Sequence, residues 1–243
     1  LRVAGDAHLD VGRIGNDAGR WEVAGALVLR AQEFSNRGGQ LSHSGTDAAR
    51  VNVAGSFDNS DRQLASNASA LAIASGVLVN ERGRIEHAGA AGLTVDAGAL
   101  HGRDGAMVTA GAANLTAGTV DHRGATLSAV QTTVTAAAFD NRGGRITATR
   151  SSANTLDTGT LDNGDGGRIE SNGDLHLRAD TLGNAAGTIQ HAGMGTLAID
   201  ARTLDGAGGA IESNGALALT GDTTDLRGGT TTAQRISNHT GRL

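Results

Sequence analysis

The sequence predicts an all-β protein, a parallel β-helix (solenoid) of about 11 coils of roughly 21 residues, with three short strands per coil. Two observations predict this fold: one turn motif recurs along nearly the whole chain, and apolar residues alternate with polar ones before each copy. No segment shows apolar residues at helical spacing, and glycine interrupts every candidate helix.

The turn motif is clearest at Phe139–Ile146, where two apolar residues seven positions apart enclose a polar turn with two glycines. The other apolar pairs are Ile14/Trp21, Phe34/Leu41, Phe57/Leu64, Leu78/Ile85, Leu100/Met107, Val120/Leu127, Leu182/Ile189, Leu204/Ile211 and, with one extra residue, Leu161/Ile169. Their mean spacing is about 21 residues, and a fixed period of this size indicates a solenoid. A leucine-rich repeat is disfavoured because the glycine-rich return contains no helical segment.

Alternating segments such as Leu27–Leu29, Leu71–Ile73 and Leu175–Leu177 predict the first strand of each coil, with one face buried. The two apolar members of the turn motif then centre a second and a third strand. Such strands bury their inner faces only by pairing with the equivalent strand one coil along, about 4.8 Å away. The residues expected to form this core include Phe34, Phe57, Phe139, Ile85, Ile146, Ile169, Ile189 and Ile211.

Two further features of the turn motif have structural interpretations. Gly143 and Gly144 suit backbone positions with positive φ, which glycine adopts at little cost. Two positions after the first apolar member stands a column of asparagines, broken only by Gly102, His122 and Gly206: Asn16, Asn36, Asn59, Asn80, Asn141, Asn163 and Asn184. These side chains either stack as an amide ladder or serve their own turns, and both interpretations stay open.

The composition agrees with a thin, layered core. Glycine supplies 38 of 243 residues, about twice ordinary usage, and aromatic residues only 2%. The net charge of −5, with both signs interleaved, disfavours nucleic-acid binding. The chain contains no cysteine and no apolar run near the roughly 20 residues of a membrane helix. We expect one repeat array over residues 1–243, cut from a longer protein.

The end of this array, residues 223–243, is expected to be an irregular terminal coil. There Asp225 occupies the apolar position of the motif, or Leu226 takes it through a one-residue slip.

Three groups of polar residues are candidates for chemistry. His43, His87 and His191 share the position two residues past an apolar anchor, and we expect exposed side chains on one face, too far apart to share a metal ion. Asp121, Asp140 and Asp162 lie on consecutive coils. They form either a calcium site or, as we expect, a solvated ladder with Arg123 and Arg142.

Catalysis on a β-helix would need paired carboxylates in a cleft built from long loops. Glu86, Glu170 and Glu212 share a column but lie on coils that are not neighbours, and the turns are short. The sequence therefore predicts no enzyme, no catalytic or metal-binding residue and no cofactor.

The motif at Phe139–Ala148, at Leu161–Ser171 leading into Gly173–Leu177, and at Leu204–Ser213 leading into Gly215–Leu219 resembles the repeats of filamentous haemagglutinins and of contact-dependent growth-inhibition effector stalks. The resemblance covers about residues 6 to 222. It implies a right-handed parallel β-helix, a monomeric rod that is exported by two-partner secretion and displayed on the surface of a Gram-negative bacterium.

The function implied is that of a shaft supporting cell adhesion or delivery of a distal domain. The implied partners are an outer-membrane transporter during export and a cell-surface receptor or glycan bound through the parent protein. The alternatives are a binding module that recognises a host glycan or receptor through one face and, less favoured, a polysaccharide-active enzyme.

Overall fold

The computed structural model describes residues 1–240, and in these residues the chain is all-β, with parallel sheets and no helix. It forms a β-solenoid of about eleven turns that recur about every 21 residues, which confirms the predicted fold class. The chain divides into two units, residues 1–120 and residues 121–243, and each is described by itself.

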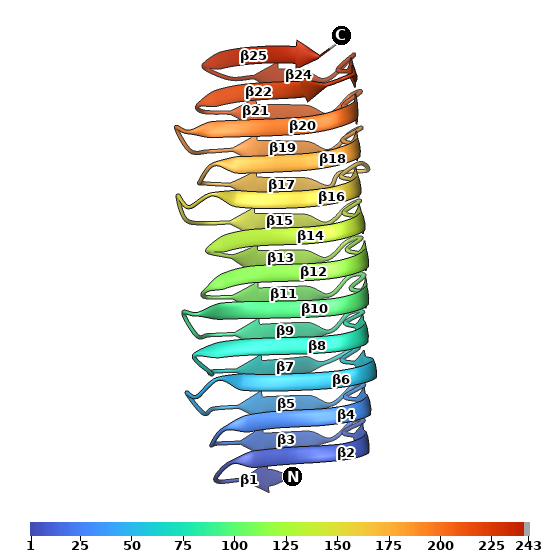
Figure 1. The fold of residues 1–243 in the computed structure, drawn as a ribbon, viewed down its shortest axis with the longest axis vertical. Coiled ribbons are helices and arrows are strands. Elements are labelled where there is room, and N and C mark those ends of the chain that lie inside the picture. Colours follow the sequence, from blue (N-terminus) through green and yellow to red (C-terminus); the bar gives the residue numbers. More distant parts are fainter. Residues whose placement is uncertain (241–243) are drawn as a thin grey trace. The chain divides into compact units, whose positions relative to one another are not determined.

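In the first unit each turn contributes one short and one long strand (Figure 1). The short strands are β1 (Arg2–Val3), β3 (Arg20–Val23), β5 (Gln40–His43), β7 (Gln63–Ser66), β9 (Arg84–His87) and β11 (Ala106–Thr109). The long strands are β2 (Ala7–Gly15), β4 (Leu27–Ser35), β6 (Ala49–Asp58), β8 (Ala70–Val79), β10 (Gly92–His101) and β12 (Ala112–Asp121). Each strand pairs in parallel with its equivalent in the next turn, so equivalent residues stack.

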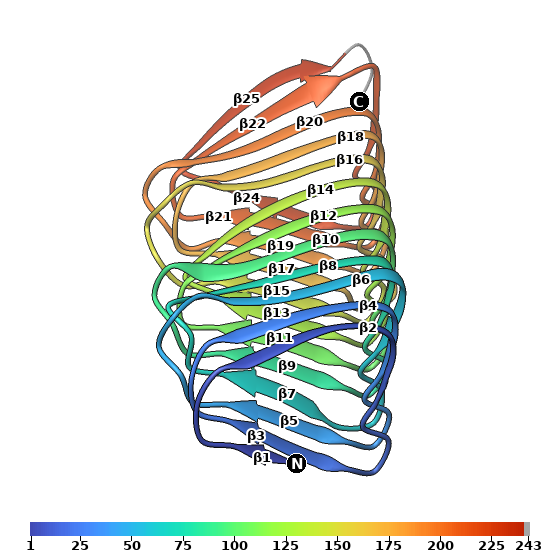
Figure 2. The same cartoon turned by 60° about the horizontal axis from the view of Figure 1, so that its bottom comes forward.

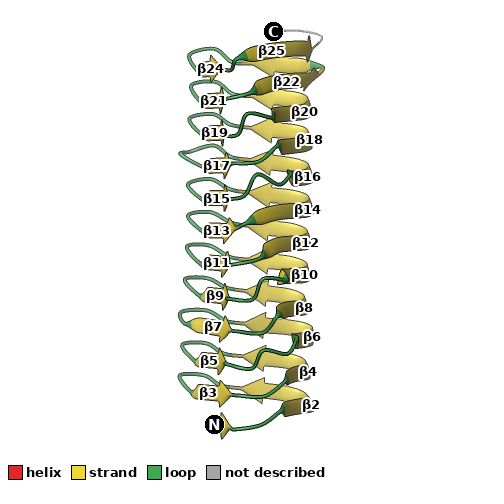
Figure 3. Ribbon diagram, turned by 90° about the vertical axis from the view of Figure 1, so that its left-hand side faces the viewer, coloured by secondary structure: helices red, strands yellow, loops and turns green. Residues whose placement is uncertain are grey.

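The second unit repeats this arrangement. Its short strands are β13 (Thr126–Ala129), β15 (Arg145–Ala148), β17 (Arg168–Ser171), β19 (Thr188–His191), β21 (Ala210–Ser213) and β24 (Thr230–Thr232). Its long strands are β14 (Gln131–Asp140), β16 (Asn154–Asp162), β18 (Leu175–Gly183), β20 (Thr196–Asp205) and β25 (Arg235–Thr240), with β22 (Ala216–Gly221) and β23 (Thr223–Asp225) together pairing with β20. Figure 3 shows the short and long strands on opposite sides of each turn.

The prediction of three strands per coil is wrong for most turns, because the first two expected strands form one bent strand. In β10, Ala97 and Ala99 are both paired with β8, and only Gly98 between them leaves the pairing. The spacing of buried residues changes at Gly98, and in the sequence this change resembles a strand boundary. Figure 2 shows these long strands as continuous, curved ribbons. Within residues 1–240, only the turn with β22, β23 and β24 has three separate strands.

The core consists of stacked apolar columns inside each unit. Phe34 and Phe57 lie ring on ring with centroids 4.7 Å apart and an interplanar angle of 1°. The residues expected in the core are all buried: Phe34, Phe57, Phe139, Ile85, Ile146, Ile169, Ile189 and Ile211. Because each of these side chains packs on its equivalent one turn away, apolar burial accumulates turn by turn.

The two glycines of the turn serve different purposes. Gly143 has a φ of 62°, a left-handed conformation that favours glycine. Gly144 has no positive φ, so the expectation for it was wrong. A Cβ on Gly144 would lie 2.4 Å from the backbone oxygen of His122 and 2.6 Å from Oδ1 of Asn141. The second glycine is therefore required by the close approach of the neighbouring turn.

The last turns also differ from expectation. Thr224, not Asp225 or Leu226, pairs with Leu204 and fills the apolar position, where it is buried. The pairing places Asp225 opposite Asp205, one residue further along. Strands β24 and β25 lie in the segment expected to be irregular, and residues 241–243 of that segment lie outside the described residues.

We predict that Ile146→Asp lowers the free energy of unfolding by several kcal/mol, because it buries a carboxylate without a partner between Leu127 and Ile169. Arg142→Ala is the control, since the Arg142 side chain is 40% exposed and its ion pairs are worth on the order of 0–1 kcal/mol. Urea unfolding followed by circular dichroism measures both changes. Equal stability of the two variants would contradict the inward orientation of Ile146.

Candidate functional site

Buried asparagine side chains form a hydrogen-bonded ladder in the first unit. Nδ2 of each Asn donates to Oδ1 of the next: Asn16 to Asn36 at 2.6 Å, Asn36 to Asn59 at 2.8 Å and Asn59 to Asn80 at 2.8 Å. All four residues are at most 5% exposed. Of the two interpretations that the sequence left open, the structure shows the ladder.

The second unit contains an equivalent ladder. Nδ2 of Asn141 donates to Asn163 at 2.7 Å, and Nδ2 of Asn163 donates to Asn184 at 2.7 Å. Nδ2 of Asn184 then donates to the backbone oxygen of Ala210. A buried amide without partners would cost about 1–3 kcal/mol, so stacking identical amides satisfies groups that the interior could not otherwise hold.

His122 takes the place of an asparagine at the start of the second ladder. Its Nδ1–H donates to Oδ1 of Asn141 at 2.7 Å, which fixes the tautomer, and its Nε2 is buried without a hydrogen-bond partner. Burial lowers the pKa of His122 to about 4, although the hydrogen bond to Asn141, the charge of Asp121 and the backbone of Thr126 each raise it. The ring therefore stays neutral at physiological pH.

The histidine column expected on the surface lies inside instead. His43, His87 and His191 are at most 3% exposed. Each ring contacts a hydroxyl of the next turn through Nδ1: His43 with Ser66 at 2.9 Å, His87 with Thr109 at 3.0 Å and His191 with Ser213 at 2.9 Å.

The histidines lie inside because alternate residues of a strand point to the same face. A residue two positions past a buried anchor such as Ile85 points to the same face, so His87 must also point inward. Nε2 of His87 donates to the backbone oxygen of Ala68 at 2.9 Å. Burial lowers the pKa of His87 and of His191. The rings of the histidine column fill the interior and hydrogen-bond to hydroxyl groups of the next turn.

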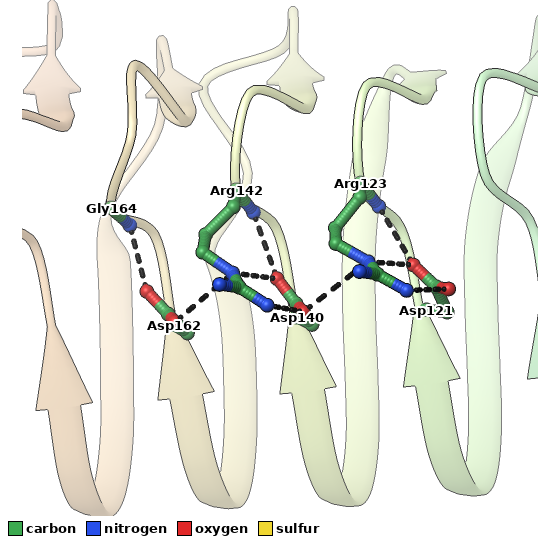
Figure 4. Close-up of polar contacts among 6 residues, drawn as sticks. All are labelled: Asp121, Arg123, Asp140, Arg142, Asp162 and Gly164. Carbon is green, nitrogen blue, oxygen red and sulfur yellow. Dashed lines mark hydrogen bonds and ion pairs between the residues drawn. The ribbon is translucent and has the colours of Figure 1, made fainter.

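The aspartate column lies at the surface and is bridged by arginines (Figure 4). Arg123 binds Asp121 through two hydrogen bonds of 2.8 and 2.6 Å, and its Nε lies 3.5 Å from Asp140. Arg142 binds Asp140 at 3.0 and 2.7 Å, and its Nε lies 3.3 Å from Asp162.

The electrostatics follow from this alternation. Partial burial raises the pKa of Asp140, but the hydrogen bonds and charge of Arg142, together with the charge of Arg123, outweigh it and hold that pKa below its ordinary value. The guanidinium groups of Arg123 and Arg142 thus lie between neighbouring carboxylates, in the positions that a bridging cation would occupy. Among the described residues, no group of three or more His, Asp or Glu is arranged to hold a metal ion.

The shared column of Glu86, Glu170 and Glu212 contains no carboxylate pair, because these residues lie on β9, β17 and β21, which are not neighbours within their units. Glu170 is bound by Arg145 at 2.5 Å and Arg168 at 2.9 Å. The first ion pair joins neighbouring turns and the second lies within β17, and the two guanidinium groups neutralise the carboxylate.

Sequence reasoning missed one buried polar group, Asn154. It occupies the first inward position of β16, pairs with Leu175, and is 1% exposed. Its Oδ1 accepts the backbone N–H of Thr132 and its Nδ2 donates to Ser171, both at 2.8 Å. The detectable signal was an Asn at the inward position that Leu175 and Leu197 occupy in the next two turns.

We predict that Asn163→Ala lowers the free energy of unfolding by about 2–4 kcal/mol, because it removes the partners of two buried amides, Asn141 and Asn184. Asn214→Ala is the matched control. Its side chain is exposed and makes one hydrogen bond, to the backbone of Ala192. Urea unfolding measures both, and a cost for Asn163→Ala no larger than that of the control would refute the ladder's contribution.

We predict that His122 makes the second unit sensitive to acid. The unfolded chain takes up a proton near the ordinary pKa of 6.5, whereas the folded ring stays neutral to about pH 4. Stability is therefore complete above pH 6.5 and falls by about 3 kcal/mol between pH 7 and pH 4.

The control is His122→Asn, which restores an amide that can donate to Asn141 and does not titrate. Urea unfolding at pH 7 and pH 4 should show a loss about 3 kcal/mol larger for the wild type than for this variant. The same pH dependence in both proteins would show that another group is responsible.

The comparisons with known proteins fit this geometry. The described part of the chain contains no helix with the length and hydropathy needed to cross a bilayer. Neither the curated proteins nor the solved structures include a match. A family model described as Haemagglutinin repeat matches residues 4–61, 87–163, 150–201 and 192–241, which together make up most of the sequence. The chain therefore belongs to the haemagglutinin repeat family, a structural, adhesin-type family typical of secreted and surface proteins.

Proposed function

We propose that this chain is a rod-forming shaft segment of a filamentous adhesin or of a contact-dependent inhibition effector. The observation that carries this proposal is that the interior asparagine side chains hydrogen-bond to the equivalent asparagines one turn away, as in the two asparagine ladders. A repeat of this kind gains stability from its neighbours and can be extended by adding turns. Its role is to hold an adhesive or toxic domain at a distance from the cell that makes it.

We further propose that the parent protein is exported by two-partner secretion and displayed on the surface of a Gram-negative bacterium. Membership of the haemagglutinin repeat family supports this. The absence of cysteine is compatible with a solenoid that folds outside the cell without forming disulfides. The partners would be an outer-membrane transporter during export and a receptor or glycan on the target cell.

We also propose that the segment is a monomer, has no enzymatic activity and binds no cofactor. Two features support this: the shared glutamates lie on separated strands, and the surface column of Asp121, Asp140 and Asp162 is neutralised by arginine. Paired carboxylates for glycoside cleavage require a cleft that brings two free acids together.

We predict that deleting residues 190–211, one complete period, preserves a folded solenoid and shortens its longest dimension by about 5 Å. The deletion joins Ile189 to Glu212, and Glu212 is the paired equivalent of Gln190, so every later residue keeps its orientation. Small-angle X-ray scattering measures the length and circular dichroism measures the strand content.

Deleting residues 190–200, about half a period, is the control for that experiment. It joins Ile189 to Ala201, a residue of the long strand β20, and so moves the following core residues out of their columns. This variant should unfold or aggregate. A shaft of stacked turns is ruled out if both deletions give folded proteins of unchanged length.

Surface display is tested with antibodies against this chain on intact and permeabilised cells of the source bacterium. Labelling of intact cells that disappears after brief protease treatment supports the proposal. Labelling only after permeabilisation would overturn it.

A further inference from the structure

Two long loops of the second unit join a short strand to the following long strand (Figure 1). Residues 149–153 lie between β15 and β16, and residues 192–195 lie between β19 and β20. Each loop is held at its first residue by an asparagine of the next turn. Nδ2 of Asn172 donates to the backbone oxygen of Thr149 at 2.8 Å. Asn214 holds the start of the second loop in the same way, at 3.1 Å.

The packing of these loops also requires a glycine after each asparagine. A Cβ on Gly173 would overlap the backbone oxygen of Ser152, and a Cβ on Gly215 would overlap that of Gly195. Neither position accepts a larger residue, because closely packed backbone does not yield as the end of a flexible side chain does. The long loops are thus accompanied twice by the dipeptide Asn-Gly, and in both cases the asparagine is exposed.

Asn-Gly is the dipeptide in which asparagine most readily loses its side-chain amide. The backbone nitrogen of the glycine attacks Cγ of the asparagine, the C–N bond of the side-chain amide breaks, and ammonia leaves with the proton of the attacking nitrogen. The five-membered succinimide ring that forms then adds water at either of its carbonyl carbons, which gives aspartate or isoaspartate. Glycine favours the attack because it has no Cβ and adopts a wide range of backbone angles.

The first unit contains an internal comparison for these sites, Asn67. It is exposed and follows a buried serine, as Asn172 does. The N–H after Asn67 donates to Oγ of Ser66 at 3.2 Å, and the N–H after Asn172 donates to Oγ of Ser171 at 3.1 Å. The next residue differs, because Ala68 carries the Cβ that glycine lacks. Asn67 therefore has the same hydrogen-bonded turn without the labile dipeptide.

Asn163 is a second comparison, because it precedes a glycine but lies in the buried ladder. Its side chain is fully buried, and Nδ2 donates to Asn184 at 2.7 Å and to the backbone oxygen of Thr188 at 3.1 Å. The N–H of Gly164 donates to Oδ1 of Asp162 at 2.9 Å. These bonds hold both reacting groups in place, and burial keeps water from the ring that would form. The fold thus protects this Asn-Gly and exposes the other two.

We propose that Asn172 and Asn214 are sites of spontaneous deamidation, with water as the co-reactant, and that the reaction releases the two long loops. The product is ionised at neutral pH, so a carboxylate replaces the amide donor and faces the carbonyl oxygen of Thr149 or Ala192. Each loop loses a hydrogen bond and gains a repulsion. The change accumulates with the age of the protein. This modification goes beyond the shaft function and does not depend on it.

The sites are tested by ageing the intact, folded chain in mildly alkaline buffer and following each asparagine by peptide mass spectrometry. We expect Asn172 and Asn214 to deamidate about tenfold or more faster than Asn67 and Asn163. In urea, where burial is lost, Asn163 should react as fast as the other two Asn-Gly sites. The assignment is wrong if Asn172 and Asn214 react no faster than Asn67, or if Asn163 keeps pace with them in the folded chain.

Release of the first loop is tested with Asn172→Asp, which is the aspartate product of the reaction. Arg150 is exposed in that loop, and the rate at which trypsin cleaves after it reports how often the loop opens. Asn214→Asp is the matched control, because it makes the same charge change two turns further along. Circular dichroism confirms that both variants are folded.

We expect Asn172→Asp to speed cleavage after Arg150 about tenfold and the control to change it less than about twofold. Equal rates of cleavage after Arg150 in the two variants would overturn the proposed release of the loop.

Discussion

The dominant constraint on this chain is that each interior side chain meets its own equivalent one turn away. Parallel pairing between neighbouring turns fixes the distance between equivalent residues at about 4.8 Å and determines which residues are in contact. A residue is therefore accepted only if it packs on, or hydrogen-bonds to, a residue at the same position. Phenylalanine meets phenylalanine at Phe34 and Phe57, and amide meets amide at Asn141 and Asn163.

Departures from this rule come with a compensating neighbour. Each buried histidine of the inner column faces a serine or threonine hydroxyl, as His87 faces Thr109. Asn154, at the inward position that Leu175 occupies in the next turn, reaches Ser171 and the backbone of Thr132. Where Gly206 replaces an asparagine, the Leu226 side chain occupies the space that a larger residue would need. An unusual residue at an interior position is thus accommodated by residues of an adjacent turn.

The fold could be predicted from the sequence because the residues that mark its period are large apolar residues, which are expected only in the core. The anchors Phe139 and Ile146, seven apart, and the alternation before them define both the turn and the inner face. The number of strands could not be predicted, because the bend at Gly98 changes the spacing of buried residues without breaking the backbone pairing.

The polar columns were less predictable. The inward direction of His87 follows from the period of two, which the expectation of an exposed side chain did not take into account. The amide ladder could not be decided because asparagine suits both a turn and a buried stack. Only the hydrogen bonds distinguish these roles, and they depend on side-chain geometry that the sequence does not contain.

The asparagine ladders have one more property, which is polarity along the stack. Every amide donates toward the higher-numbered turn, and Nδ1 of His122 keeps that direction. The advancing end of a growing stack therefore always presents an N–H, and each arriving turn supplies the oxygen that receives it. The stack is therefore a directional template for folding. If the turns fold in order from the N-terminal side, each new asparagine meets an N–H donor that is already in position.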